Sequence, residues 1–199
     1  QEPWAYSEGA LSIIRHFVRL RYVFLPYLYN LFAEHEKSGE AILRPLFYDF
    51  ADTEALALGR IDDQYLVGPL IMQAPCVGEK QQRQVGLPDG RWLCGIDGSW
   101  LSGGRSITAS RTAASTPVYF REGGLVPFQP GIRTDNRCDL SRIGLLCCLS
   151  LRFPGKAQAT YRCDDGETYA YKEGRRSEIA VSARVEKRRL FIDAETLAA

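Results

Sequence analysis

The sequence predicts a mainly β protein that begins with one helical segment, and three observations support this fold class. Apolar residues recur at helical spacing through residues 8–37. After residue 40, short apolar or alternating runs take over. Gly, Pro, Asp and Asn bound these runs, as is typical of antiparallel sandwich or barrel modules.

The helical segment is expected to extend from about residue 8 to about residue 37. Ser7 is the expected N-cap, and Glu8 places an acidic group in the first turn. A straight helix of this length would measure ~45 Å, too long to lie on a small domain. Pro26 lacks a backbone donor, so we expect it to kink or restart the helix. Ser38-Gly39 is the expected end.

The rest of the chain is expected to form short strands joined by tight turns. The turn signals include Pro88-Asp89-Gly90, Asp97-Gly98 and Asp165-Gly166. The polar stretch 131–141 is the best candidate for a boundary between two β modules. The expected strands are residues 41–47, 65–72, 84–87, 92–96, 106–109, 117–120, 125–128, 143–153, 159–162, 169–171, 178–185 and 190–193.

Composition limits the function classes. The 199 residues are 45% hydrophobic with a formal net charge of +1, enough for one large or two small globular domains. This composition argues against disorder, collagen and coiled coils. The near-zero charge excludes a strongly basic nucleic-acid binder. No apolar run reaches the roughly 20 residues that a membrane span needs. We therefore expect neither a nucleic-acid nor a membrane partner.

The cysteines indicate thiols and no metal site. The chain has six Cys and two His, and no C-x-x-C pair. A zinc site needs clustered ligands, so we expect no metal. Buried free thiols in a reducing compartment are expected, which favours a cytoplasmic location. A disulfide that involves Cys138 or Cys163 stays open.

The N-terminal end raises a question of completeness. The chain begins at Gln1 and lacks the opening of a signal peptide. Either the start was removed or the sequence is a piece of something longer. A helix as apolar as residues 8–37 needs more partners than the following β runs supply. We therefore expect it to be the last helix of a larger unit.

Six groups of segments carry a joint signal. They are 1–4 (QEPW) with 19–22 (RLRY) and 25–29 (LPYLY); 44–50 (RPLFYDF); 62–69 (DDQYLVGP) with 74–75; 87–92 (LPDGRW) with 103–104; 117–124 (PVYFREGG) with 126–127; and 164–171 (DDGETYAY). In this order and spacing the chain resembles glycoside hydrolase family 31, the α-glucosidase and α-xylosidase group.

The resemblance implies an α+β fragment: the last helix and strand of a (β/α)8 barrel followed by two antiparallel β-sandwich domains. Residues 1–50 would be the C-terminal end of the catalytic barrel, 51–134 the proximal domain and 135–199 the distal domain. The implied protein is a retaining α-glycosidase, with α-glucosidase as the expected activity. This piece would brace the barrel, and the chain alone would be inactive.

The resemblance also implies partners. An α-linked oligosaccharide or glucoside would bind through the barrel, without a cofactor, and a homo-oligomer stays open. A standalone carbohydrate-binding or interaction β module is the alternative function.

No catalytic residue is assigned to this chain. Retaining hydrolysis needs two carboxyl groups about 5–5.5 Å apart, at the C-terminal ends of barrel strands. The resemblance implies that both aspartates, and the His and Arg that contact substrate, lie on barrel segments upstream of Gln1. We therefore assign no catalytic, substrate-binding or metal residues.

Three groups inside the chain are candidate sites. Asp62-Asp63 could be a catalytic pair, but adjacent extended residues point to opposite faces, which favours a turn before a strand. Residues 164–167 could bind calcium, but they lack EF-hand spacing, which favours a hairpin turn. Arg44 is expected to pair with Asp49 or Asp63 rather than with substrate.

The remaining candidates are two histidines and three tryptophans. His16 and His35 are expected to be structural or solvated. Any of the tryptophans, Trp4 included, could stack on a sugar ring. Trp92 is the expected sandwich-core residue, which leaves Trp100, in a Gly/Ser-rich stretch, as the better sugar-stacking candidate.

Overall fold

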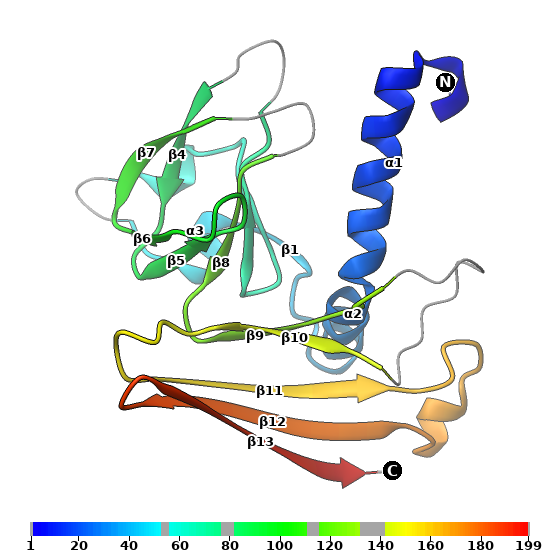
Figure 1. Cartoon of the computed structure of the whole chain (residues 1–199). Helices are drawn as coiled ribbons and strands as arrows, with labels where there is room; N and C mark the ends of the chain where they lie inside the picture. The colour runs from blue at the N-terminus through cyan, green and yellow to red at the C-terminus, as the bar shows by residue number, and fades with distance from the viewer. Residues whose placement is uncertain (1, 53–55, 77–81, 111–115, 132–141, 199) are drawn as a thin grey trace. The chain divides into compact units, whose positions relative to one another are not determined.

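The computed structural model describes residues 2–52, 56–76, 82–110, 116–131 and 142–198. The chain forms two compact units (Figure 1). The first unit comprises residues 1–39 and 123–199, and the second comprises residues 40–122. No described helix is both long and apolar enough to cross a membrane.

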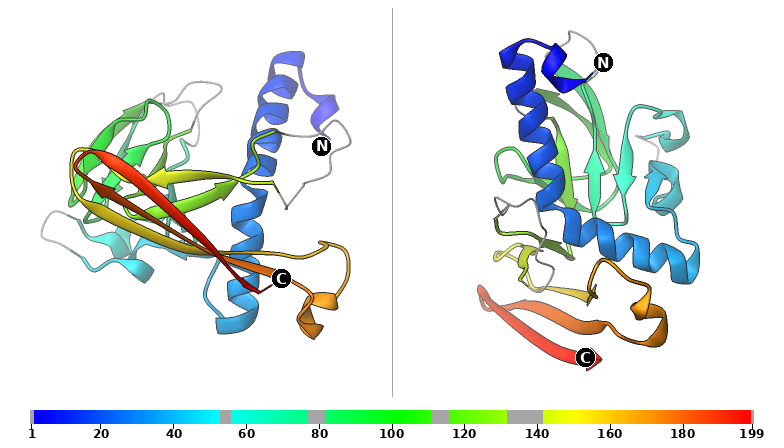
Figure 2. Two further views of the ribbon diagram at one scale, coloured as in Figure 1. Left: turned by 60° about the horizontal axis from the view of Figure 1, so that its bottom comes forward. Right: turned by 90° about the vertical axis from the view of Figure 1, so that its right-hand side faces the viewer.

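The first unit begins with two helices, α1 (Glu8–Val23) and α2 (Leu25–Ser38), after a short 3-10 turn at Pro3–Ala5. The Ser7 side chain accepts a hydrogen bond from the Ala10 N–H at 3.4 Å, which confirms the predicted N-cap. The two helices run in clearly different directions (Figures 1 and 2). Pro26 lies in the first turn of α2, where its missing N–H leaves no bond unmade, so the predicted break is confirmed.

Gly39 ends α2 in the left-handed conformation, with φ +76°, and its N–H bonds the His35 carbonyl at 2.8 Å. This confirms the predicted end of the helix.

The β part of the first unit consists of two antiparallel sheets. β9 (Gly124–Phe128) pairs with β10 (Gly144–Cys148). β11 (Gly155–Cys163), β12 (Ser177–Glu186) and β13 (Arg189–Ala198) form a three-stranded sheet in that order, with β13 at its edge (Figure 2). Alternate residues of β12 face the core of this unit, as the period of a strand requires. The core comprises Leu125, Leu149, Ala157, Val181, Ala183 and Val185. Helix α2 contacts both β9 and β11.

The second unit is built on a six-stranded antiparallel sheet in the order β1-β2-β3-β8-β5-β6, beside the separate pair β4-β7. Two short helical turns, α3 (Leu46–Asp49) and a 3-10 turn (Leu58–Arg60), belong to it. Trp92 is fully buried in the core, and its Nε1–H donates to the Pro88 carbonyl at 2.9 Å. The strands are β1 (Leu43–Pro45), β2 (Tyr65–Val67), β3 (Ile71–Gln73), β4 (Gln82–Leu87), β5 (Arg91–Cys94), β6 (Trp100–Ser102), β7 (Arg105–Ser110) and β8 (Val118–Arg121).

Several strand predictions need correction. Residues 65–72 form two strands rather than one, because the chain reverses at Gly68, where φ is +57°. The predicted strand 41–47 shortens to β1, since the chain turns into α3 directly after Pro45.

Residues 169–171, predicted as a strand, belong to a 3-10 turn at Ala170–Glu173. Strand β6 was not predicted, and the predicted strand 143–153 ends at Cys148. The predicted domain boundaries at 50 and 134 stay predictions, and residues 132–141 lie outside the described ranges.

Candidate functional site

A pocket of about 500 Å³ lies in the first unit, between α2 and the connection from β11 to β12. Its volume falls within the range of about 300–1,000 Å³ that small-molecule sites occupy. Helix α2 contributes side chains from Tyr29 to Glu36, and the strand end and connection contribute residues between Arg162 and Arg176.

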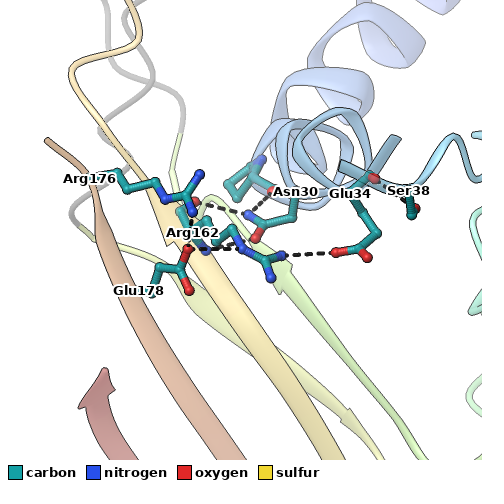
Figure 3. A network of polar contacts seen from close by, with 7 residues as sticks. Asn30, Glu34, Ser38, Arg162, Arg176 and Glu178 are labelled. Carbon is teal, nitrogen blue, oxygen red and sulfur yellow. Dashed lines mark hydrogen bonds and ion pairs between the residues drawn. The ribbon is translucent and has the colours of Figure 1, made fainter. Parts of the chain in front are cut away.

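Asn30 attaches α2 to β11 through its side-chain amide (Figure 3). Its Oδ1 accepts a hydrogen bond from the Arg162 N–H at 2.7 Å, and its Nδ2 donates to the Arg162 carbonyl at 3.1 Å. Nδ2 also donates to the Pro26 carbonyl at 3.0 Å. The amide thus offers β11, the edge of its sheet, one donor and one acceptor, as a neighbouring strand would.

The Arg162 guanidinium extends this attachment into a charged network (Figure 3). Its Nη1 lies 3.2 Å from Glu34 Oε2, and its Nε lies 3.4 Å from Glu178 Oε1. Arg176 Nη2 lies 2.8 Å from the same Glu178 oxygen. Arg162 and Glu178 keep only 16% and 18% of their side-chain surface exposed, so the ion pair between these two residues is screened less than surface pairs. The network links α2, β11 and β12.

The connection after β11 is held by the side chains of its own aspartates. Asp165 Oδ1 accepts hydrogen bonds from the N–H groups of Glu167 and Thr168 at 3.0 and 2.9 Å. The Thr168 hydroxyl donates to Asp165 Oδ2 at 2.6 Å. These bonds, with the Thr168 side chain first, lower the pKa of Asp165 because they stabilise the carboxylate. Gly166, at φ +67°, supplies the positive φ expected of the Asp-Gly step.

Two tyrosines tie the same connection to α2. The Tyr29 hydroxyl donates to Asp164 Oδ2, and the Tyr171 hydroxyl donates to Glu36 Oε1 at 3.2 Å. Burial, and then the bond to Asp164, raises the pKa of Tyr29. The acidic segment 164–167 therefore forms a turn, as predicted, although it opens a long connection rather than a tight hairpin. The described residues contain no cluster of His, Cys, Asp or Glu that could hold a metal ion.

Arg44 forms an ion pair with Asp49, one of its two predicted partners. Its Nη1 lies 3.0 Å from Asp49 Oδ1, and its Nη2 lies 3.3 Å from Glu40. The Arg44 side chain is buried, and its guanidinium stacks over the Tyr48 ring. Asp63, the other candidate, pairs instead with Arg83 at 2.5 Å. Arg44 therefore serves the packing of the second unit.

The other predicted candidates lie apart from one another. Asp62 and Asp63 are exposed just before β2. His16 is exposed on α1, against the edge of the Phe17 ring, and agrees with the structural or solvated interpretation. His35 is exposed on α2 and lines the pocket.

Among the tryptophans, the core position of Trp92 is confirmed. Trp100 is half-buried on β6, with the Arg91 guanidinium 5.1 Å from its ring centroid. Trp4 is 75% exposed. Sugar stacking by Trp100 stays a prediction.

The described cysteines are free thiols, as predicted, but only one of these five is buried and the other four are half-buried. Cys76, Cys94, Cys147, Cys148 and Cys163 are free thiols, and Cys138 lies outside the described residues. Cys148 is fully buried, and burial raises its pKa to about 12, with a smaller contribution from Cys147. Such a thiol is a packing residue rather than a nucleophile.

Sequence reasoning missed Asn30 and Arg162 as site residues. One signal was present for each. Asn disfavours helix interiors, and its place in the middle of α2 indicates that its side chain has a specific partner. Arg162 is a charged residue one position before the end of β11. Neither signal identifies the other residue, because 132 positions separate them.

Two family models match successive parts of the chain. Residues 1–31 match the TIM-barrel domain of glycosyl hydrolases family 31, and residues 39–126 match the C-terminal domain of that family. The chain is 33% identical over 175 residues to alpha-glucosidase 2 of Bacillus thermoamyloliquefaciens, which is 87% of this chain and 22% of the relative. It is 31% identical over 196 residues to the alpha-xylosidase of Saccharolobus solfataricus, 96% of this chain and 26% of the relative.

Solved structures give the same fold. A GH31 dextranase of Flavobacterium johnsoniae, complexed with glucose, superposes with a TM-score of 0.85 at 23% identity, over 98% of this chain and 24% of its own. A GH31 alpha-xylosidase from Xanthomonas citri superposes with a TM-score of 0.78 at 29% identity, over 91% of this chain and 20% of its own. The chain spans about a quarter or less of the length of these proteins.

Proposed function

From the premise that the chain belongs to glycoside hydrolase family 31, whose C-terminal portion it matches, we propose that it is the C-terminal part of a retaining α-glucosidase. The relatives at 33% and 36% identity are an alpha-glucosidase 2 and an alpha-glucosidase, which supports glucose as the sugar. The substrate class is then an α-linked glucoside or oligosaccharide, hydrolysed by a barrel that this chain helps to hold.

The proposed role of the chain is to brace the barrel. The observation that carries it is the pair of hydrogen bonds between Asn30 and the Arg162 backbone. Asn30 lies within the segment that matches the barrel domain, and Arg162 lies on β11 of the three-stranded sheet. The ion pair between Arg162 and Glu34 reinforces the same attachment.

The exposed face of α1 supports the same role. No residue of α1 is buried, and Val18 and Tyr22, which lie four residues apart on one face of the helix, are 49% and 40% exposed. An amphipathic helix of this kind is stabilised by packing its apolar stripe against other elements. A barrel supplies such a surface, since its helices form a ring around the strands.

We propose that catalysis itself rests on barrel aspartates outside this chain. A retaining mechanism requires a nucleophile and an acid/base at barrel strand ends. The adjacent pair Asp62-Asp63 does not supply such a site, because Asp63 is bound by Arg83 and the pair precedes an antiparallel strand. The 199-residue chain is therefore expected to be inactive on aryl α-glucosides.

The activity test uses the native gene product, captured with an antibody against this chain. Its intact mass is measured, and it is assayed with an aryl α-glucoside, an aryl α-xyloside and dextran. A mass well above 22.3 kDa with fastest cleavage of the glucoside supports the proposal. Faster cleavage of the xyloside or dextran would overturn the α-glucosidase assignment, and activity of the pure 199-residue chain would overturn the location of catalysis.

A cytoplasmic location is part of the proposal. Its support is that the described cysteines are all free thiols, as in a reducing compartment. Fractionation of source cells with the same antibody tests it, and recovery of the protein from the culture medium would contradict it.

A further inference from the structure

We propose that the pocket between α2 and the β11–β12 connection binds a glucosyl unit of a neutral α-linked oligosaccharide. The choice of glucose rests on the proposed function, whereas the choice of a neutral sugar rests on the lining of the pocket. The site lies wholly in the first unit and does not include the adjacent pair Asp62-Asp63.

Two exposed aromatic rings, one from α2 and one from the β11–β12 connection, line this pocket. Phe32 on α2 is 60% exposed, and Tyr169 on the connection is 76% exposed. Large exposed apolar side chains that gather around a hollow mark binding sites rather than ordinary surface. A pyranose ring presents C–H groups on its faces, which an aromatic ring can cover.

The ring of Tyr169 is held in place by its neighbours. The Lys172 ammonium lies 5.1 Å from the centroid of the Tyr169 ring and 5.9 Å from that of Tyr171. The two tyrosine rings lie 6.3 Å apart at a tilt of 49°. The Tyr171 hydroxyl donates a hydrogen bond to Glu36, which connects the pair of tyrosine rings to α2.

The polar lining favours hydroxyl groups over an anion. The carboxylates of Glu36, Asp164 and Glu167 line the pocket with the guanidinium groups of Arg162 and Arg176. Both arginines are already paired with Glu178, and Arg162 is also paired with Glu34, so two carboxylates balance their charge. An anionic ligand would lie close to the pocket's carboxylates, whereas a sugar hydroxyl can donate to a carboxylate and accept from a donor at the same time.

The connection is ordered before any ligand arrives. The bonds from Asp165 to Glu167 and Thr168 fix the backbone on one side of the pocket. The Asn30–Arg162 contact fixes the strand end on the other side. Because a preformed site pays less ordering entropy on binding, even a small sugar can bind measurably.

The test is a titration of the 199-residue chain with maltotriose, followed by amide chemical shifts. We expect saturable millimolar binding, with the largest shifts at the amides of Gly166 and Thr168. Tyr169→Ala and Phe32→Ala should each weaken binding about tenfold, the loss of one stacked ring. Trp4→Ala, which removes an equally exposed ring outside the pocket, should leave the affinity unchanged.

Several results would overturn the proposal. The first is a titration in which maltotriose shows no saturable binding. The second is unchanged affinity in both pocket variants, and the third is loss of binding in Trp100→Leu. The fourth is tighter binding of inorganic phosphate than of the sugar. Thermal melts check that the pocket variants remain folded, which is expected because both side chains are exposed. The titration requires no catalysis, so its failure and a failure of the α-glucosidase assignment are read separately.

Discussion

Replacement of Asn30 is the sharpest test of how α2 is attached to the β11 sheet. In Asn30→Ala, the Arg162 N–H and carbonyl lose partners at 2.7 and 3.1 Å. A net hydrogen bond contributes about 0.5–1.5 kcal/mol, and a half-buried peptide group left unpaired adds a further cost. We expect the first unit to lose about 2–3 kcal/mol. With a urea m-value of about 1–3 kcal/mol/M, its unfolding midpoint should fall by about 0.7–3 M.

The assay combines urea unfolding with amide hydrogen exchange. The Arg162 amide should exchange faster in Asn30→Ala, because the acceptor that protects it is gone. Asn30→Asp, which keeps the shape but removes the donor, should lose most of the same stability. Lys37→Ala, on the exposed end of α2, should change stability by no more than about 0.5 kcal/mol. An unchanged midpoint together with unchanged Arg162 exchange would refute the reasoning.

Three further predictions concern packing and ionisation. Gln64 is buried and bonds both the N–H and the carbonyl of Gly86 at 2.9 Å, so Gln64→Leu should cost about 2–4 kcal/mol, measured by tryptophan fluorescence in urea. Gly103→Ala should cost about 2–3 kcal/mol in the same assay, because a Cβ there would lie 1.8 Å from the Pro88 carbonyl oxygen. Stability should fall as pH rises above 9, because the unfolded Cys148 thiol ionises near pH 9 whereas its folded pKa is about 12, so the unfolded state binds fewer protons. Melts at pH 8 and about pH 10 should differ by about 1.4 kcal/mol from this residue.

Matched variants separate these effects from general destabilisation. Gln84→Ala removes an exposed amide on β4 and should change stability little. Gly9→Ala should stabilise α1 by about 0.5–1 kcal/mol, since nothing lies within 4 Å of the added Cβ. Cys148→Ala should remove its share of the alkaline loss. An equal loss in this variant would show that other groups cause it, and full stability of Gly103→Ala would contradict the close approach.

The local elements were predictable because their causes are local. Ser7 caps α1, Pro26 restarts the helix and Gly39 ends it through properties of the single residues and their immediate neighbours. The core position of Trp92 likewise followed from an apolar alternating run. By contrast, residues 169–171 were misread as a strand, because two tyrosines raise β propensity and the turn is imposed by the aspartates before them.

The candidate site was less accessible to sequence reasoning. Residues near position 30 and residues near position 165 line the same pocket, and no local sequence pattern predicts that these two segments meet. The sequence left Asp49 and Asp63 as alternative partners of Arg44, and the packing of the folded chain decides between them. Arg44 pairs with Asp49, five positions away, and Asp63 pairs with Arg83.

By itself, the sequence determined the two helices, most of the strands and turns, and the family, since these depend on periodicity, residue conformational preference and short ordered motifs. Only the tertiary structure decided how α2 is attached to the β11-β12-β13 sheet and where a pocket opens beside it. The reason is physical: the Asn30 amide acquires its role when it meets the two unpaired groups of an edge strand, and that meeting exists only in the folded chain.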